Sequence, residues 1–141
     1  MLKTIAAAAL ISAISTVGAV DAATIASLRW EKRIVIVLSS DRNGLLSEQR
    51  RSLLADEAAL ADRDLVAFAV VGDQILPIYG EAPKGETADG LRDRYDVAAA
   101  TAFSALLIGK DGGVKWRGSK PIGLAELNGL IDAMPMRRSD R

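Results

Sequence analysis

The sequence has 141 residues, no cysteine and no histidine, and its 18 basic side chains are balanced by 18 acidic ones. The missing residue types exclude thiol catalysis, Ser–His and Cys–His nucleophilic sites, and zinc sites built on nitrogen or sulfur ligands. The zero net charge disfavours nucleic-acid binding, because proteins that neutralise phosphates carry a basic excess or a concentrated basic face.

Residues 1–22 have the composition of a signal peptide. A short basic start precedes the apolar run of residues 5–14, and Val20 and Ala22 supply the small residues that a signal peptidase requires. A membrane anchor is the weaker alternative, because serine, threonine and glycine interrupt the apolar run before the roughly 18 residues of a spanning helix. We expect cleavage after Ala22 and a periplasmic or secreted domain over residues 23–136, with no membrane attachment.

A strand, a helix and a second strand are predicted in the first half of this domain. Residues 34–38, IVIVL, form a β-branched run typical of a strand buried on both faces. The polar loop SSDRNG (39–44) leads into one amphipathic helix over residues 45–61, in which leucines recur every seven positions. Residues 64–72, DLVAFAVVG, repeat the buried-strand pattern, so the unit should be βαβ with parallel strands.

Turn residues divide the second half. Residues 73–86 contain two prolines and two glycines, which indicates a long loop without regular structure. Thr87 should cap a short helix that continues to Val97. Residues 103–118 predict two strands around an Asp-Gly-Gly turn.

A final helix over residues 122–134 should end at Pro135 and leave a flexible basic tail at 137–141. The order β-α-β-α-β-β-α predicts an α/β fold of thioredoxin-like type. It would have a four-stranded mixed sheet with helices on both faces.

Five segments spread over the chain also carry a family resemblance: LRWEKR (28–33), RDLVAFAVVGD (63–73), LRDRYDV (91–97), LLIGKDGGVKWR (106–117) and IDAMPMRR (131–138). Together they resemble the secreted bacterial family called domain of unknown function 4174, and GKDGGVK and MPMRR are the most specific pieces. The resemblance implies a thioredoxin-like fold outside the cytoplasm and similarity to domains of vertebrate extracellular-matrix and sushi-repeat proteins. It supplies no established catalytic residues.

The chain departs from redox-active thioredoxins at two places. SSDRNG stands where those enzymes carry two thiols at the start of the first helix, and Phe103 stands at about the position of their cis-proline. Thiol–disulfide oxidoreductase and thiol peroxidase activities are therefore excluded.

The same loop is the first candidate binding site. Asp41, Arg42, Asn43 and Gly44 would open the helix, whose free amides could bind an anion or a peptide. The alternatives are that Arg42 is simply solvated and that Asp41 or Asn43 caps the helix. Asp41, Asn43 and Glu48 do not follow a calcium-loop pattern, so we expect no metal and no cofactor.

Exposed aromatic and basic residues are further candidates. Tyr79 should lie exposed in the long loop, as a possible contact surface. Trp30 and Trp116, with adjacent lysines and arginines, could form a patch for glycans or acidic partners, although alternation along VKWRG favours a core position for Trp116. The basic tail (Arg137, Arg138, Arg141) could bind acidic surfaces or complement a helix dipole.

The leading functional prediction is an exported, non-catalytic binding module whose partner is an unknown protein or glycan of the cell envelope. One alternative is a cysteine-free enzyme that uses Asp41, Glu48 or Asp73 for general acid–base chemistry. Another is an envelope stress protein that acts through a redox-active partner.

Overall fold

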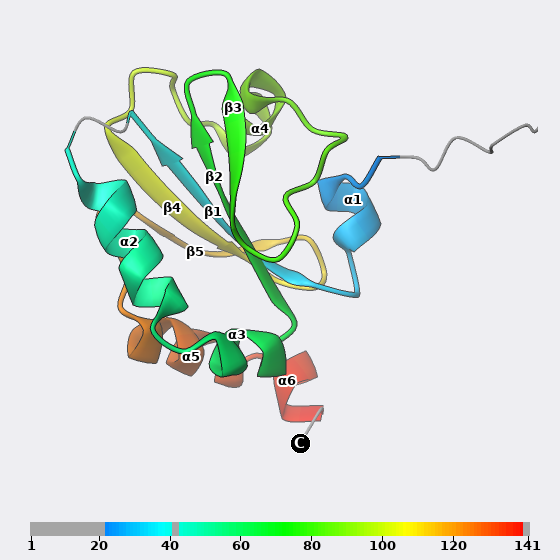
Figure 1. Cartoon of the computed structure of the whole chain (residues 1–141). Coiled ribbons are helices and arrows are strands. Elements are labelled where there is room, and N and C mark those ends of the chain that lie inside the picture. Colours follow the sequence, from blue (N-terminus) through cyan, green and yellow to red (C-terminus); the bar gives the residue numbers. More distant parts are fainter. Residues whose placement is uncertain (1–21, 41–42, 140–141) are drawn as a thin grey trace, which may run out of the picture.

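The computed structural model describes residues 22–40 and 43–139, and its centre is a five-stranded mixed sheet in the order β3-β2-β1-β4-β5 (Figure 1). β1 and β2 run parallel, and every other neighbouring pair is antiparallel. The strands are β1 (Arg33–Ser39), β2 (Leu65–Val71), β3 (Gln74–Tyr79), β4 (Phe103–Ile108) and β5 (Val114–Gly118). The α/β, thioredoxin-like fold is confirmed, with one strand more than the predicted four.

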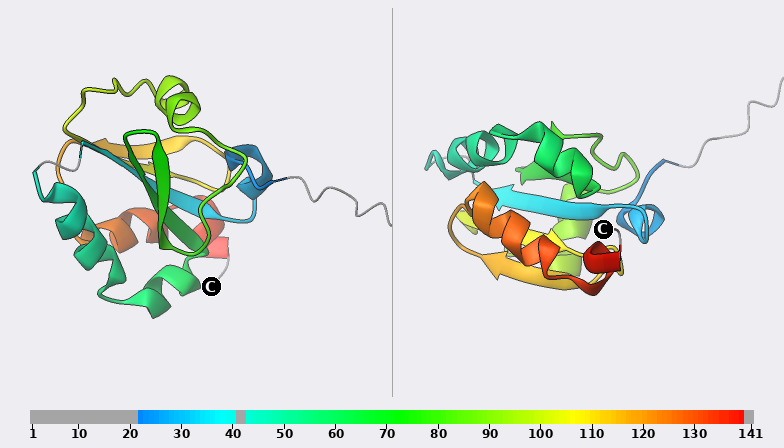
Figure 2. Two further views of the ribbon diagram at one scale, coloured as in Figure 1. Left: turned by 45° about the horizontal axis from the view of Figure 1, so that its top comes forward. Right: turned by 90° about the horizontal axis from the view of Figure 1, so that it is seen from below.

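Helices cover both faces of the sheet, as predicted (Figures 1 and 2). They are α1 (Ile25–Leu28), α2 (Leu45–Leu54), α3 (Glu57–Asp62), α4 (Ala88–Tyr95), α5 (Leu124–Asp132) and α6 (Pro135–Ser139). Val35 and Val37 of β1 face the leucines of α2, α3 and α5, whereas Ile34 and Ile36 face α1 and α4. All seven residues of β1 are buried, which explains why its sequence is apolar without alternation. In the part of the chain that the structure describes, no helix has the length and apolar character needed to span a bilayer.

The fifth strand corrects the prediction of a structureless loop over residues 73–86. β3 returns antiparallel to β2 through a turn in which Gly72 has φ +59°, a left-handed conformation that glycine adopts without strain. Pro77 pairs opposite Phe68 on the outermost strand, where a missing N–H leaves no central ladder unsatisfied. The prolines and glycines therefore mark an edge hairpin and not an irregular segment. Tyr79 ends this strand half-buried against the core, so its predicted exposure in a loop is wrong.

Two helices, α2 and α3, replace the single helix predicted over residues 45–61. The break lies at Asp56, whose backbone leaves the helical region (φ −149°) and whose carboxylate accepts the Ala59 N–H at 3.1 Å. An aspartate that caps the next helix competes with continuation of the previous one. The sevenfold leucine spacing survives the break, because Leu53 and Leu60 are both fully buried. The short helix α1, with its Thr24–Ser27 capping box, was not predicted.

A buried amide joins α2 to the start of α5. Gln49 is 0% exposed; its Nε2 donates to the Ile122 carbonyl at 3.0 Å, and its Oε1 accepts the Ile122 N–H at 2.8 Å. Ser52 donates to the same carbonyl at 3.0 Å. This segment before α5 therefore has its backbone polar groups satisfied by side chains instead of by a neighbouring strand.

The C-terminal segment is another correction. α5 ends at Asp132, two residues before the predicted end at Met134, and Pro135 begins α6, which is consistent with the preference of proline for the first helical turn. Arg137, predicted as the start of a flexible tail, is buried; its Nε contacts Asp132 at 3.2 Å, its Nη1 donates to the Asp62 carbonyl at 2.8 Å, and it forms an ion pair with the Asp62 carboxylate. These contacts hold α6 beside α3 (Figure 2). Residues 140–141, including Arg141, lie outside the described residues.

Candidate functional site

The predicted thiol-site loop lies at the carboxyl end of the central strand β1, beside Ala102, the residue before β4. The Ala102 carbonyl accepts the Ser40 N–H at 3.1 Å. It also accepts the Ser39 hydroxyl at 3.3 Å and the Asn43 side-chain amide at 3.2 Å. With the Ser40 hydroxyl at 3.5 Å, four donors of the loop therefore point at one carbonyl of the same chain. Asp41 and Arg42 lie outside the described residues.

The first turn of α2 is organised by Asn43 and Gly44. Gly44 occupies the N-cap in the left-handed region (φ +71°), and its carbonyl accepts the Glu48 N–H at 3.1 Å. The Asn43 side-chain oxygen accepts the Leu45 N–H at 3.1 Å, in agreement with the capping interpretation of this residue. Asn43 thus uses its amide to fix the loop and its oxygen to satisfy the helix start.

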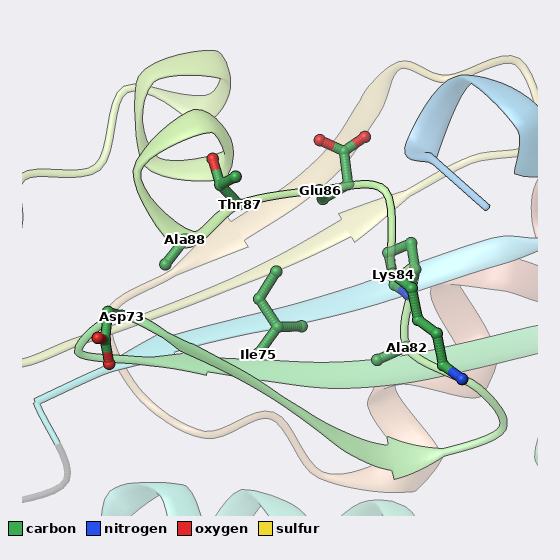
Figure 3. A pocket seen from close by; sticks show the side chains of 8 residues that line it. Asp73, Ile75, Ala82, Lys84, Glu86, Thr87 and Ala88 are labelled. Carbon is green, nitrogen blue, oxygen red and sulfur yellow. The ribbon is translucent and has the colours of Figure 1, made fainter. Parts of the chain in front are cut away.

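Of the acidic residues considered for catalysis, Glu48 and Asp73 do not meet in one cavity, and Asp41 lies outside the described residues. Asp73 lines a hollow of about 300 Å³ between β3 and the segment before α4, while Glu48 is exposed on α2 and does not line it. In this hollow Ile75 points from β3 toward the segment before α4, and the Glu86 carboxylate points away (Figure 3). Glu86 accepts the Ile25 N–H at 2.9 Å and pairs with Arg94 at 3.6 Å, which joins α1 to α4. Residues 22–40 and 43–139 contain no cluster of three or more acidic side chains suited to a metal ion.

A second candidate site surrounds Trp30. Its side chain is 59% exposed, although its backbone has φ +71°, which a bulky residue rarely adopts. The Trp30 N–H donates to the Lys110 carbonyl at 2.6 Å, so the chain is fixed to the β4–β5 turn at this point. The Arg29 guanidinium lies 5.0 Å from the centre of the indole ring, within the range of a cation–π contact.

Beside Trp30 lies a cavity of about 370 Å³, which we call the Trp30 cavity. Its other lining residues come from the β4–β5 turn and from the α5–α6 junction: Gly109, Lys110, Asp111, Lys115, Met134, Pro135 and Met136. The motifs GKDGGVK and MPMRR, distant in sequence, therefore meet there. Trp116 does not line the cavity; it is half-buried and packs against the core, as the alternation along VKWRG favours.

Two ion pairs fix the β4–β5 turn at the edge of this cavity. Lys110 Nζ lies 2.8 Å from Asp64 Oδ2, and Lys115 Nζ lies 2.7 Å from Asp111 Oδ2. The hydrogen bond from Lys110 lowers the pKa of Asp64 below its ordinary value. The bond from Lys115, with the Gly113 N–H, lowers the pKa of Asp111 in the same way. Both carboxylates therefore favour the charged form.

The Asp64 contact predicts a loss of stability in acid. Since folding lowers the Asp64 pKa, its contribution is present above the unfolded value of about 3.9 and disappears as the pH falls through the folded value. We expect the urea midpoint of the natural chain to exceed that of Asp64→Asn at about pH 7 and the difference to shrink as the pH falls below about 3.9. Asp93→Asn, at an exposed position of α4, is the control and should change little at either pH. A gap between the natural chain and Asp64→Asn that stays constant with pH would contradict this assignment.

Sequence reasoning identified Trp30 and the turn separately but missed the cavity. One side of the Trp30 cavity is formed by the α5–α6 junction, which places Met134 and Met136 beside the β4–β5 turn. The signal in the sequence is a proline flanked by two methionines after an amphipathic helix, a pattern that also indicates a helix end.

Comparisons with known proteins fit this structure. The family model described as domain of unknown function (DUF4174) matches residues 24–140. The chain is also similar to "Coiled-coil domain-containing protein 80" of Danio rerio, with 30% identity over 128 residues, which cover 79% of this chain and 15% of that protein. The chain thus corresponds to a small part of that relative. With nearly all of the described residues inside the family match, the chain belongs to the DUF4174 family.

Proposed function

We propose that this chain is an exported, non-catalytic thioredoxin-like module that binds a protein or glycan of the cell envelope. The observation that carries the proposal is the state of the thiol-site loop. The sequence has no cysteine, and Ser39, Ser40 and Asn43 direct their donors to the Ala102 carbonyl. Donors that are already bonded to a main-chain carbonyl of the same chain are not aimed at a reacting group, as stabilisation of a transition state requires.

Two further observations support the proposal. The described residues form a five-stranded sheet and the family model matches residues 24–140, so the scaffold is present in a sequence that lacks redox groups. The composition of residues 1–22 supports export. The carboxylate-enzyme alternative gains no support, because Glu48 and Asp73 do not line a common cavity. Action through a redox-active partner stays a prediction.

The proposal is tested by turnover and by cross-linking. The purified chain should reduce insulin disulfides and hydrogen peroxide no faster than buffer does, with dithiothreitol as electron donor. In cells, cross-linking of the tagged full chain should give a discrete adduct in the envelope fraction, retained in Asn43→Ala. A chain lacking residues 2–22 is the control for compartment. Measurable turnover, or no adduct beyond that of the control, would overturn the proposal.

A further inference from the structure

We infer that the Trp30 cavity binds an aromatic side chain within an acidic segment of a partner protein. This inference rests on the proposed function and names the site and the partner chemistry. Its three supports are the backbone of Trp30, the lining of the cavity and the charge at its edge.

Trp30 has a strained backbone conformation, and its side chain is exposed to solvent. A left-handed conformation is disfavoured for any residue with a Cβ and is routine only for glycine. The 2.6 Å bond to the Lys110 carbonyl keeps the chain in that conformation, yet the indole is 59% exposed and adds little to the core. Strain of this kind around an exposed aromatic residue is typical of a contact site.

The lining of the cavity suits an aromatic ring. Met134 and Met136 are flexible side chains whose sulfur atoms make favourable contacts with ring edges. Trp30 supplies a ring for edge-to-face or offset contact. A volume of about 370 Å³ lies at the small end of ligand sites, which suits one inserted side chain better than an extended ligand. A glycan would need more hydroxyl-binding side chains than this mainly apolar lining offers.

The charge at the edge favours an acidic partner. Lys110 and Lys115 are each paired with a carboxylate, whereas no acidic side chain of the described residues forms an ion pair with Arg29. Arg29 lies across the β4–β5 turn, where a Cβ added to Gly112 would be 3.7 Å from its Cδ. Arg29, which stacks on the Trp30 ring and is neutralised by no carboxylate of the described residues, therefore places a positive charge near the apolar cavity, and opposite charge on the partner would complement it.

The experiment is a peptide titration followed by amide-proton NMR of the full chain. The probe is the acetylated, amidated peptide EDEFEDE, compared with EDEAEDE and with KKKFKKK. We expect EDEFEDE to shift the Trp30 indole N–H and the Gly109 and Gly112 amides saturably, at the weak affinities of short peptides, and to leave the Trp116 indole unmoved. The other two peptides should bind about tenfold more weakly or not at all.

Variants separate the site from the fold. Trp30→Gly removes the ring at a backbone position that glycine adopts freely, so the protein should stay folded while its affinity for EDEFEDE falls about tenfold. Arg29→Gln should weaken binding and reduce its dependence on salt. Leu76→Ala, at an exposed apolar residue of β3, is the control and should bind as the natural chain does.

Three outcomes would overturn the inference: equal shifts with the alanine or lysine peptide, saturable shifts at Trp30 with maltoheptaose but not with EDEFEDE, or no shift at Trp30 in the folded natural chain at millimolar peptide. Such a failure is distinguishable from failure of the proposed function. If the envelope adduct persists in Trp30→Gly, the chain binds through another surface; if no adduct forms in the natural chain, the proposed function itself fails.

Discussion

Replacing Leu53 with alanine lowers the free energy of unfolding by about 2–5 kcal/mol. Leu53 is 0% exposed on α2 and packs between the sheet and the helices of that face. The substitution removes its apolar contacts and leaves a cavity that the surrounding strands cannot fill. Urea unfolding followed by circular dichroism measures the change.

Leu54→Ala is the matched control for this prediction. Leu54 is the next residue of α2, has the same helix propensity cost on substitution, and is only half-buried. We expect a loss of about 1 kcal/mol. Equal losses for the two leucines would contradict the finding that α2 buries Leu53 more deeply than Leu54.

Replacing Gln49 with leucine lowers the free energy of unfolding by roughly 1–3 kcal/mol, although the new side chain is more hydrophobic. The Ile122 N–H would lose its acceptor in a buried environment, and the Ile122 carbonyl would keep only the Ser52 hydroxyl. A buried backbone donor without a partner costs more than the added apolar contact returns. The measurement is again the urea midpoint.

Gln74→Leu controls for the change from amide to leucine. Gln74 is exposed at the start of β3, and its substitution should alter stability by no more than about 0.5 kcal/mol. Amide hydrogen exchange adds a second test, because Gln49→Leu should accelerate exchange at Ile122 and in the first turn of α5. Unchanged exchange there, with unchanged stability, would contradict the role assigned to Gln49.

Most of the fold was predictable because its signals are local. The apolar runs that became β1 and β2 are too short and too rich in branched residues for helices, and the Asp-Gly-Gly turn fixes the next hairpin. Thr87 was identified as the cap of α4, and its hydroxyl accepts the Gly90 N–H at 3.0 Å. These elements depend on side chains within a few residues of each other.

The predictions of secondary structure are wrong where the position of a residue in the tertiary structure overrides its local conformational preference. Pro77 disfavours a strand in general but is compatible with an edge, and sequence alone does not show which strand is outermost. Asp56 lies within a continuous helical pattern, so the sequence does not indicate that it caps a second helix. The sequence near Arg137 is typical of a solvated tail, whereas in the folded chain Arg137 contacts Asp62 and Asp132.

The candidate sites also differ in how far the sequence predicts them: one lies within a single segment, and the other is formed by distant segments. The strand–helix pattern predicts a loop before α2, and Asn43 could be recognised as a helix-start residue; the role of this loop as a binding site stays a prediction. The Trp30 cavity could not be found, because it requires three segments that the chain order keeps apart. Positive φ at a tryptophan also has no signature in sequence, since glycine or asparagine would be expected there.

The order of strands also determines when the domain can fold. β1, the first strand in the chain, lies at the centre of the sheet and pairs along one side with β4, which begins only at Phe103. Until β4 has emerged during synthesis, one edge of β1, whose five central residues are all apolar, has no partner. The native sheet can therefore form only after the last third of the chain has been synthesised.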